Sequence, residues 1–110
     1  MGDLFRKELW KLKEKYSLIR DIRGAGLMIG MEFGTTQPAG RKGTVEVPAT
    51  DKARAFIAEA MRHGVVLLPS GPGHNVISIT PPFIITEKEI QFSVNLFDKI
   101  LKKLQETPSF

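Results

Sequence analysis

Hydrophobic residues recur along this chain with two periods, and together they predict seven elements in the order α-β-β-α-β-β-α. A helix is predicted from Asp3 to about Tyr16, with Asp3 as its N-terminal cap. Its apolar stripe consists of four residues at helical spacing: Phe5, Leu9, Leu12 and Tyr16. Glu8 and Lys11 lie three residues apart, so they can form a weak ion pair on the exposed side of this helix.

A hairpin is predicted after this helix. Alternating residues over Ile19–Arg23 indicate a short strand, Gly24-Ala25-Gly26 a turn, and Leu27–Phe33 a second strand. The region from Gly34 to about Ala49 is rich in glycine and proline and has little to bury, so it is predicted to be a loop.

The second helix is predicted to begin at a cap formed by Thr50 or Asp51 and to run to about His63, with Gly64 ending it in a left-handed conformation. Its apolar face comprises Ala53, Phe56, Ile57, Ala60 and Met61. Two further strands, separated by a turn, then follow in the order Val65–Leu68, Pro69–Gly73 and Val76–Thr80.

The last predicted strand runs into Pro81-Pro82, where it must stop or bend because proline cannot donate to a sheet. Thr86 and Glu89 then have the spacing of a capping box, which starts a helix that runs to about Gln105. A wide apolar stripe lies along this helix: Ile90, Phe92, Val94, Leu96, Phe97, Ile100, Leu101 and Leu104. Pro108 is expected to close the ordered region.

This order of elements predicts an α+β fold, with a small, mainly antiparallel sheet and helices on one of its faces. The chain of 110 residues fits one domain spanning residues 1–110. The other face of the sheet would then be solvated.

Composition narrows the function classes. The net charge of +4 is concentrated in Arg6–Lys15 and Lys99–Lys103, which are predicted to be solvated helix faces, so binding to nucleic acid is not expected. There is no cysteine, which excludes disulfides and thiol chemistry. No signal peptide and no membrane-spanning run are recognised, and we expect a soluble, cytoplasmic protein.

No catalytic residue stands out from the pattern. His63 precedes a helix-ending glycine and His74 follows a Gly-Pro-Gly turn, so both are interpreted as structural or exposed, and no metal site is expected. Serines lack the context of a nucleophile elbow, and the lysines lie in charged or helical surroundings that do not favour a Schiff base. The glycines from Gly24 to Gly30 miss the dinucleotide-binding spacing and are typical of a hairpin.

Two segments carry a family resemblance: RDIRGAGLMIGMEF over residues 20–33 and NVISITPPFIIT over residues 75–86. In this order they resemble the C-terminal small domain of class III aminotransferases, the 4-aminobutyrate, ornithine and acetylornithine type that depends on pyridoxal phosphate. The resemblance runs from about Leu9 to about Leu104. It implies the fold of the C-terminal domain of fold-type I pyridoxal-phosphate enzymes.

The resemblance also implies what this chain does not contain. In such enzymes the cofactor lysine, the phosphate-binding loop and the acidic partner of the pyridinium nitrogen belong to a large domain. We therefore expect that this chain alone neither holds pyridoxal phosphate nor transaminates. A large domain or companion chain is the implied partner, and self-association into a dimer or other homo-oligomer is also expected, since an isolated small domain exposes the face that meets the large one.

One residue departs from the family pattern. The family usually has an arginine three residues before the Pro-Pro pair, where its guanidinium binds the substrate carboxylate, and here that position is Ser78. The carboxylate is then held elsewhere, or the substrate lacks one, or the reading frame is that of a decayed gene. Arg23 matches the arginine of the family's hairpin and is expected to tie the turn to backbone carbonyls, with substrate contact as the weaker interpretation.

The parent reaction implied by the resemblance is transfer of an amino group from an amine or amino acid to a 2-oxo acid, as in a 4-aminobutyrate aminotransferase. An amino-acid or lactam racemase or epimerase of the same family is the nearest alternative. Two others remain open: a non-catalytic ligand-binding module, which would bind an amino acid saturably, and an interaction protein, which would dimerise without a ligand.

Overall fold

The computed structural model describes residues 2–25, 28–79 and 86–106. Three α-helices and five strands make up most of this part of the chain, together with one short 3₁₀ helix. In chain order they are α1 (Gly2–Lys15), β1 (Ile19–Ala25), β2 (Met28–Pro38), η1 (Gly40–Lys42), β3 (Thr44–Pro48), α2 (Thr50–Arg62), β4 (Leu68–Ser70), β5 (Val76–Ile79) and α3 (Glu87–Glu106).

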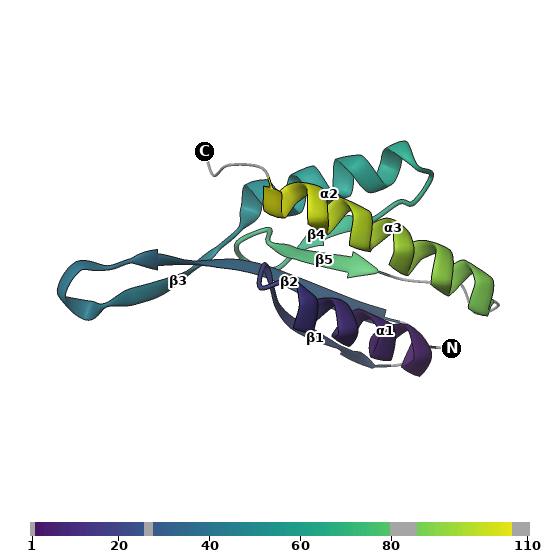
Figure 1. Ribbon diagram of the computed structural model, residues 1–110, viewed down its shortest axis with the longest axis horizontal. Helices are drawn as coiled ribbons and strands as arrows, with labels where there is room; N and C mark the ends of the chain where they lie inside the picture. Colours follow the sequence, from purple (N-terminus) through teal and green to yellow (C-terminus); the bar gives the residue numbers. More distant parts are fainter. Residues whose placement is uncertain (1, 26–27, 80–85, 107–110) are drawn as a thin grey trace.

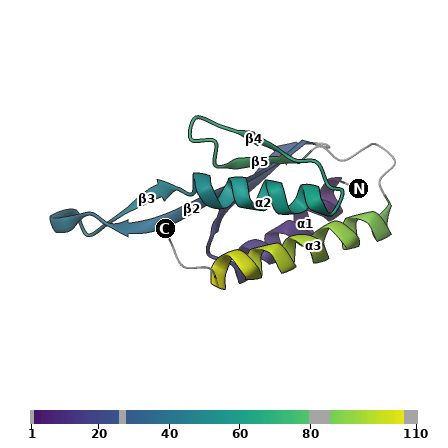
Figure 2. The ribbon, with the colours of Figure 1, turned by 90° about the horizontal axis from the view of Figure 1, so that it is seen from above.

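The strands form one antiparallel sheet in the order β1-β2-β5-β4, and β3 pairs with the far half of β2. The three α-helices lie together on one side of this sheet (Figures 1 and 2). The α+β fold with helices on one sheet face is therefore confirmed. Along β2, Ile29, Met31 and Phe33 are buried under the helices while the residues between them face the other way, because strand side chains alternate.

The region predicted to be a loop, Gly34–Ala49, is mostly strand. β2 continues to Pro38 and pairs with β3 through a register that runs from Gly34↔Pro48 to Pro38↔Thr44. This hairpin projects from the body of the molecule (Figure 1). The loop prediction was wrong because the arm buries little, so its stability comes from ladder hydrogen bonds and β-branched residues rather than from an alternating apolar pattern.

Of the three helix N-caps predicted from the sequence, one is confirmed and two are wrong. Thr86 and Glu89 form the expected capping box: the Thr86 amide donates to Glu89 Oε1 at 3.0 Å, and the Glu89 amide donates to Thr86 Oγ1 at 3.2 Å. Asp3 instead lies inside α1 and pairs with Arg6. Neither Thr50 nor Asp51 is the N-cap of α2, which is Ala49. The Thr50 hydroxyl instead donates to the Gly73 carbonyl at 2.6 Å.

Other boundaries shift by a few residues. Gly64 ends α2 with φ +85°, as predicted. The strand predicted at Val65–Leu68 is wrong, since β4 spans only Leu68–Ser70 and the preceding residues connect α2 to the sheet. Pro81, Pro82 and Pro108 lie outside the described residues. Within those residues, no helix is both long and apolar enough to cross a membrane.

The core is organised around four phenylalanines, one from β2 and one from each α-helix. Phe56 of α2 lies 5.3 Å from Phe33 and 5.2 Å from Phe97, measured between ring centroids, and Phe97 lies 6.5 Å from Phe5. All four side chains are buried. Phe92 and Met61, which were assigned to apolar stripes, are instead more than half exposed at 58% and 54%.

A polar contact joins α1 to α3 at the edge of this core. The Tyr16 hydroxyl donates to the Asp98 carboxylate, and Lys15 Nζ lies 3.0 Å from both carboxylate oxygens. The Tyr16 hydrogen bond, aided by Lys15, lowers the pKa of Asp98 despite the opposing effect of partial burial. Burial, followed by the Asp98 hydrogen bond, raises the pKa of Tyr16. Both shifts mean that the pair stabilises the fold with Asp98 charged and Tyr16 neutral.

This contact predicts two pH limits. Because the pKa of Asp98 is lower in the folded chain, its contribution is complete above the unfolded value of about 4 and is lost as pH falls through the folded value. The raised pKa of Tyr16 gives a contribution that is complete below about pH 10 and is lost above it. Asp98→Asn should therefore flatten the acid limb of a curve of urea midpoint against pH. Glu14→Gln, an exposed change on α1, should leave it unchanged, and equal acid limbs in wild type and Asp98→Asn would contradict the assignment.

Candidate functional site

The helix-free face of the sheet places the two residues singled out from the sequence in one row. Arg23 is opposite Gly30, Gly30 is opposite Ser78, and Ser78 is opposite Leu68. The glycine therefore separates the arginine from the serine across β2. On β5 the residues on either side of Ser78, Ile77 and Ile79, are buried in the core. Arg23 and Ser78 thus share the helix-free face, the side of the sheet that none of the described α-helices covers.

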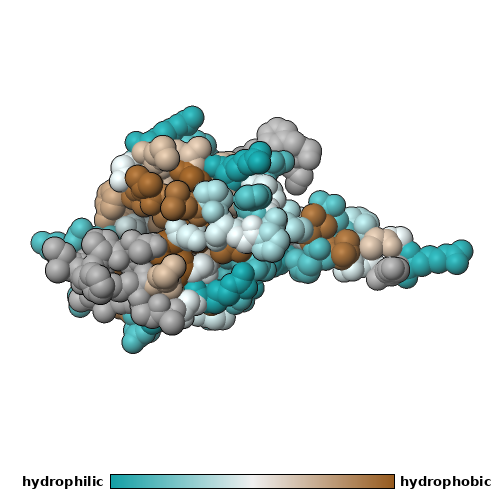
Figure 3. Space-filling model, turned by 180° about the vertical axis from the view of Figure 1, so that it is seen from behind, coloured by the Kyte–Doolittle hydropathy of each residue, from teal (hydrophilic) through white to brown (hydrophobic). Residues whose placement is uncertain are grey.

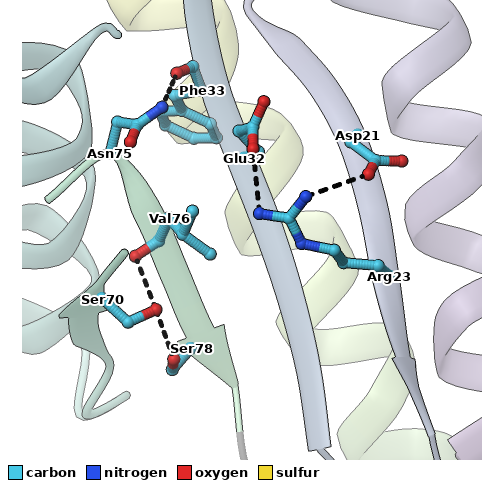
Figure 4. A network of polar contacts seen from close by, with 8 residues as sticks. All are labelled: Asp21, Arg23, Glu32, Phe33, Ser70, Asn75, Val76 and Ser78. Atoms are coloured by element: carbon cyan, nitrogen blue, oxygen red, sulfur yellow. Dashed lines mark hydrogen bonds and ion pairs between the residues drawn. The ribbon is translucent and has the colours of Figure 1, made fainter. Parts of the chain in front are cut away.

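Arg23 is paired with carboxylates and not with the backbone carbonyls that the sequence suggested. Its Nη1 lies 3.3 Å from Asp21 Oδ2, and its Nη2 donates to Glu32 Oε1 at 2.9 Å (Figure 4). Asp21 and Glu32 are opposite one another in the adjacent row, so both carboxylates lie beside the guanidinium. One positive charge therefore faces two negative charges at this end of the sheet.

Ser78 is part of a short chain of hydroxyl contacts. Its Oγ donates to Ser70 Oγ at 2.9 Å, and Ser70 Oγ donates to the Val76 carbonyl at 3.5 Å (Figure 4). The second of these contacts is long for a hydrogen bond. The Ser78 hydroxyl proton is thus directed to Ser70 and the Ser70 proton to the Val76 carbonyl, so Ser78 Oγ can still accept a hydrogen bond from another donor.

A cavity of about 270 Å³ lies over this row of residues. Its lining combines Arg23 and Ser78 with Ser70, Val76, Gly30 and Gly71. Gly30 has no side chain, so the floor between Arg23 and Ser78 is bare backbone. A Cβ at Gly30 would lie 3.3 Å from Val76 Cγ1, which leaves room for little more than the glycine itself.

A second polar cluster lies at the base of the β2–β3 arm. The buried Asn75 side chain donates to the Phe33 carbonyl at 2.7 Å, and the Phe33 amide donates to the Asn75 carbonyl at 2.9 Å. Arg20 Nε lies 3.2 Å from Glu46 Oε2 across this base but makes no geometrically acceptable hydrogen bond there. These contacts attach the arm to the sheet and serve the fold.

Sequence reasoning missed the partners of both candidate residues. Asp21 and Glu32 lie within the first segment that carries the resemblance, and the period-two pattern that placed Ile22 in the core also places them on the outer face with Arg23. That signal was available in the sequence. Ser70 had no such signal, because its contact with Ser78 depends on a three-residue strand that the pattern did not resolve.

A metal centre is not formed by the part of the chain that the structure describes. It holds no group of three histidine or acidic side chains that could bind a metal. His63 accepts or donates at the end of α2, with Nδ1 3.0 Å from the Glu59 carbonyl, and His74 is exposed in a turn. Every lysine whose side chain is described lies on an α-helix and none lines the cavity, so these residues do not fit a covalent pyridoxal-phosphate site.

The chain is similar in sequence to known proteins. The family pattern described as Aminotransferase class-III matches residues 1–101. Alanine–glyoxylate aminotransferase 2 homolog 2 of Arabidopsis thaliana is 33% identical over 104 residues, which are 94% of this chain and 20% of that protein. The alanine/serine racemase of Pyrococcus horikoshii is 29% identical over 102 residues, 93% of this chain and 20% of that protein.

Solved structures agree with these relatives. Acetylornithine aminotransferase from Elizabethkingia anophelis superposes with a TM-score of 0.71 and 28% identity, covering 93% of this chain and 23% of that one. The chain thus spans about a fifth of the length of the curated relatives that it matches. On the match over residues 1–101, the chain belongs to the class III aminotransferase family.

Proposed function

We propose that these residues form the C-terminal small domain of a pyridoxal-phosphate enzyme that transfers an amino group from an amine or amino acid to a 2-oxo acid. The observation that carries this proposal is the family match together with the helix-free sheet face, where Arg23, Ser78 and the cavity lie together. Pyridoxal phosphate, when bound in such enzymes, stabilises the carbanion formed at the substrate. The described residues of this chain supply none of that chemistry; they contribute a surface that contacts the substrate.

The subtype that we propose is the 4-aminobutyrate, ornithine and acetylornithine group, and we propose that the chain alone is inactive. Relatives named for amino-group transfer, including the A. thaliana protein, support the reaction class. The absence of a lysine from the described lining of the cavity supports the second proposal. In this arrangement the cofactor and the proton-transferring groups belong to the part of the parent enzyme that this chain does not match.

The partner that we propose is that remaining part of the enzyme, seated on the helix-free face. Met28, Val66 and Leu68 expose 66%, 72% and 64% of their surface. When the molecule is viewed from behind, hydrophobic residues form a cluster on the surface of its body (Figure 3). Exposed apolar surface of this kind favours a partner over solvent. Self-association through the same face is the competing arrangement, and concentration-dependent dimerisation in ultracentrifugation would favour it.

Racemisation of an amino acid or lactam is the second candidate function. Ser78 favours the lactam form of this reaction, because a lactam has no carboxylate for a bidentate arginine to bind. The P. horikoshii relative, named as an alanine/serine racemase, supports the same alternative. The two reactions differ in what they consume, since amino transfer requires a 2-oxo acid and racemisation does not.

Domain complementation tests the proposal. The acetylornithine aminotransferase of E. anophelis would be produced without the segment that this chain matches, and then mixed with this chain, pyridoxal phosphate, an amino-acid donor and a 2-oxo acid. We expect transfer of the donor's amino group to the 2-oxo acid in the complete mixture and not when either protein component is left out. The enzyme's own matching segment is the positive control. Restoration by that segment but not by this chain would overturn the proposal, and chiral analysis of alanine without a 2-oxo acid would reveal racemisation.

A further inference from the structure

A second cavity, of about 450 Å³, lies beside the base of the β2–β3 arm, and we call it the edge cavity. Segments that are far apart in the sequence meet there: the turn before β1, the middle of β2, the first turn of α2 and the last turn of α3. Its described lining has no residue in common with that of the cavity on the helix-free face. The edge cavity is therefore a separate place on the molecule.

One edge of β2 is uncovered at this cavity. The Gly34 amide donates to the Leu18 carbonyl at 2.9 Å, on the side of β2 that pairs with β1. The Phe33 carbonyl accepts from the Ala49 amide, so β3 follows the opposite edge. Because amides along a strand point alternately to its two edges, the Thr36 amide faces the same side as that of Gly34. It lies beyond the start of β1, so it directs a backbone donor towards the edge cavity that Thr36 lines.

Arg20 crosses β2 at this uncovered edge. Its stem passes over Gly34, where a Cβ would lie only 2.8 Å from Arg20 Cγ. Nη2 donates to Thr36 Oγ1 at 2.9 Å, whereas the buried Nε makes no hydrogen bond, although Glu46 Oε2 lies 3.2 Å away. Within the part of the chain that the structure describes, the guanidinium thus uses one of its five N–H donors in a hydrogen bond.

The charge that lines the edge cavity is positive. Arg20 and Lys52 are the charged residues of its described lining. Glu46 offsets part of the Arg20 charge but lines a neighbouring cavity and not this one. Two cations against one carboxylate leave a net positive charge. Lys52 Nζ donates to the Leu104 carbonyl at 3.0 Å, so Lys52 supplies an ammonium here and not the neutral amine that a Schiff base needs.

We infer that the edge cavity binds a phosphate group, either as inorganic phosphate or as a phosphate monoester. The planar guanidinium of Arg20 presents N–H donors in an arrangement that matches phosphate oxygens. Lys52 contributes the second positive charge, and the Thr36 amide and the Ser17 hydroxyl contribute further donors. Two positive charges favour a doubly charged phosphate over a singly charged carboxylate.

The edge cavity is larger than one phosphate ion, and part of its wall is apolar. Leu18 and Leu104 are half-buried and line it together with the polar groups. A monoester could therefore place its organic part against the two leucines while its phosphate meets Arg20. The site lies outside the surface assigned to the substrate, so this inference does not depend on the proposed function.

Amide signals of the ¹⁵N-labelled chain provide the test. Inorganic phosphate, propyl phosphate and acetate would each be titrated at about pH 7.5, where most phosphate carries two charges, with sodium chloride holding the ionic strength constant. We expect saturable shifts at Gly34 and Thr36 with both phosphate compounds, and at least about tenfold weaker binding of acetate. The amides of Gly30 and Ser78, on the helix-free face, should not shift. The compound that binds more tightly distinguishes a free phosphate from an ester.

Three variants separate a built site from general attraction to a basic chain. Arg20→Gln and Lys52→Gln should each weaken phosphate binding by about threefold to tenfold, between the values of an exposed ion pair and of a charge-assisted hydrogen bond. Arg54→Gln removes the same charge from an exposed position on α2, outside the described lining of the edge cavity. It should leave the dissociation constant unchanged within about twofold, because salt screens a distant surface charge.

The inference would be overturned if the shifts at Gly34 and Thr36 did not saturate, or if acetate bound as tightly as phosphate. Equal weakening by Lys52→Gln and Arg54→Gln would assign the binding to the net charge of +4 and would also overturn it. The amide spectra report whether each variant folds. Lys52→Gln keeps the test decisive if loss of Arg20 opens the β2–β3 arm.

Discussion

Phe97→Ala is expected to lower the free energy of unfolding by about 3–5 kcal/mol, the cost of emptying a buried phenylalanine site. Phe97 is fully buried and its ring contacts Phe56 at 5.2 Å and Phe5 at 6.5 Å between centroids, so it connects α3 to the other two α-helices. Domains of this size are stable by about 5–15 kcal/mol, so the loss is a large share of the total. The midpoint of urea unfolding should fall without a change in slope.

A matched control lies on the same helix. Phe92 is 58% exposed, although the sequence pattern assigned it to the same apolar stripe. Phe92→Ala should change the free energy of unfolding by less than about 0.5 kcal/mol, as expected for a surface site. Similar losses in the two variants would show that α3 packs on the other elements through a different face.

Gly24→Ala is expected to cost about 2–6 kcal/mol, combining backbone strain with steric overlap. Gly24 adopts φ +144°, and a Cβ built there would lie 2.0 Å from the Met28 carbonyl oxygen and 3.0 Å from Ile29 Cα. Both obstacles are backbone of β2, which cannot move aside like a flexible side chain. Relief would require the β1–β2 hairpin to open, and with it the row that holds Arg23 opposite Gly30.

Gly40→Ala provides the comparison for this effect. Gly40 also has a positive φ, +63°, but no atom lies within 4 Å of a Cβ at that position. Strain alone should cost about 1–2 kcal/mol there. Thermal unfolding would measure both variants, and amide hydrogen exchange would show faster opening of β1 and β2 in Gly24→Ala. Equal destabilisation at the two glycines would mean that the contact with Met28 is not the cause.

The helices and the core could be predicted because each depends on one periodic pattern. The stripe of Phe5, Leu9, Leu12 and Tyr16 is buried as expected, and the Thr86–Glu89 capping box forms because both partners lie within four residues of each other. Phe92 was misassigned because a stripe that wide covers more of the helix surface than one sheet and two helices bury.

Features that depend on pairing between distant strands were harder to predict. The β2–β3 arm has no apolar alternation to reveal it, and its register depends on the ladder from Gly34 to Pro38. The contact of Ser70 with Ser78 requires two short strands at a defined register, which local sequence does not specify. The carboxylate partners of Arg23 follow from strand alternation once the hairpin register is known. This part of the site could therefore have been predicted from the sequence.

The structure shows what the residues that match the family form. The matched residues provide a sheet whose helix-covered face makes the core and whose other face carries charge, hydroxyls and a cavity. On that other face, Arg23 is paired with Asp21 and Glu32, and Ser78 is hydrogen-bonded to Ser70.

The central claim is that cofactor chemistry lies outside these residues, and one measurement tests it most directly. The purified chain would be incubated with pyridoxal phosphate, reduced with borohydride, and analysed by intact-mass and peptide mass spectrometry. We predict no stoichiometric adduct, only low modification spread over several helix lysines. A single adduct of one cofactor per chain, trapped on one lysine, would contradict the claim and make the chain a cofactor-binding protein in its own right.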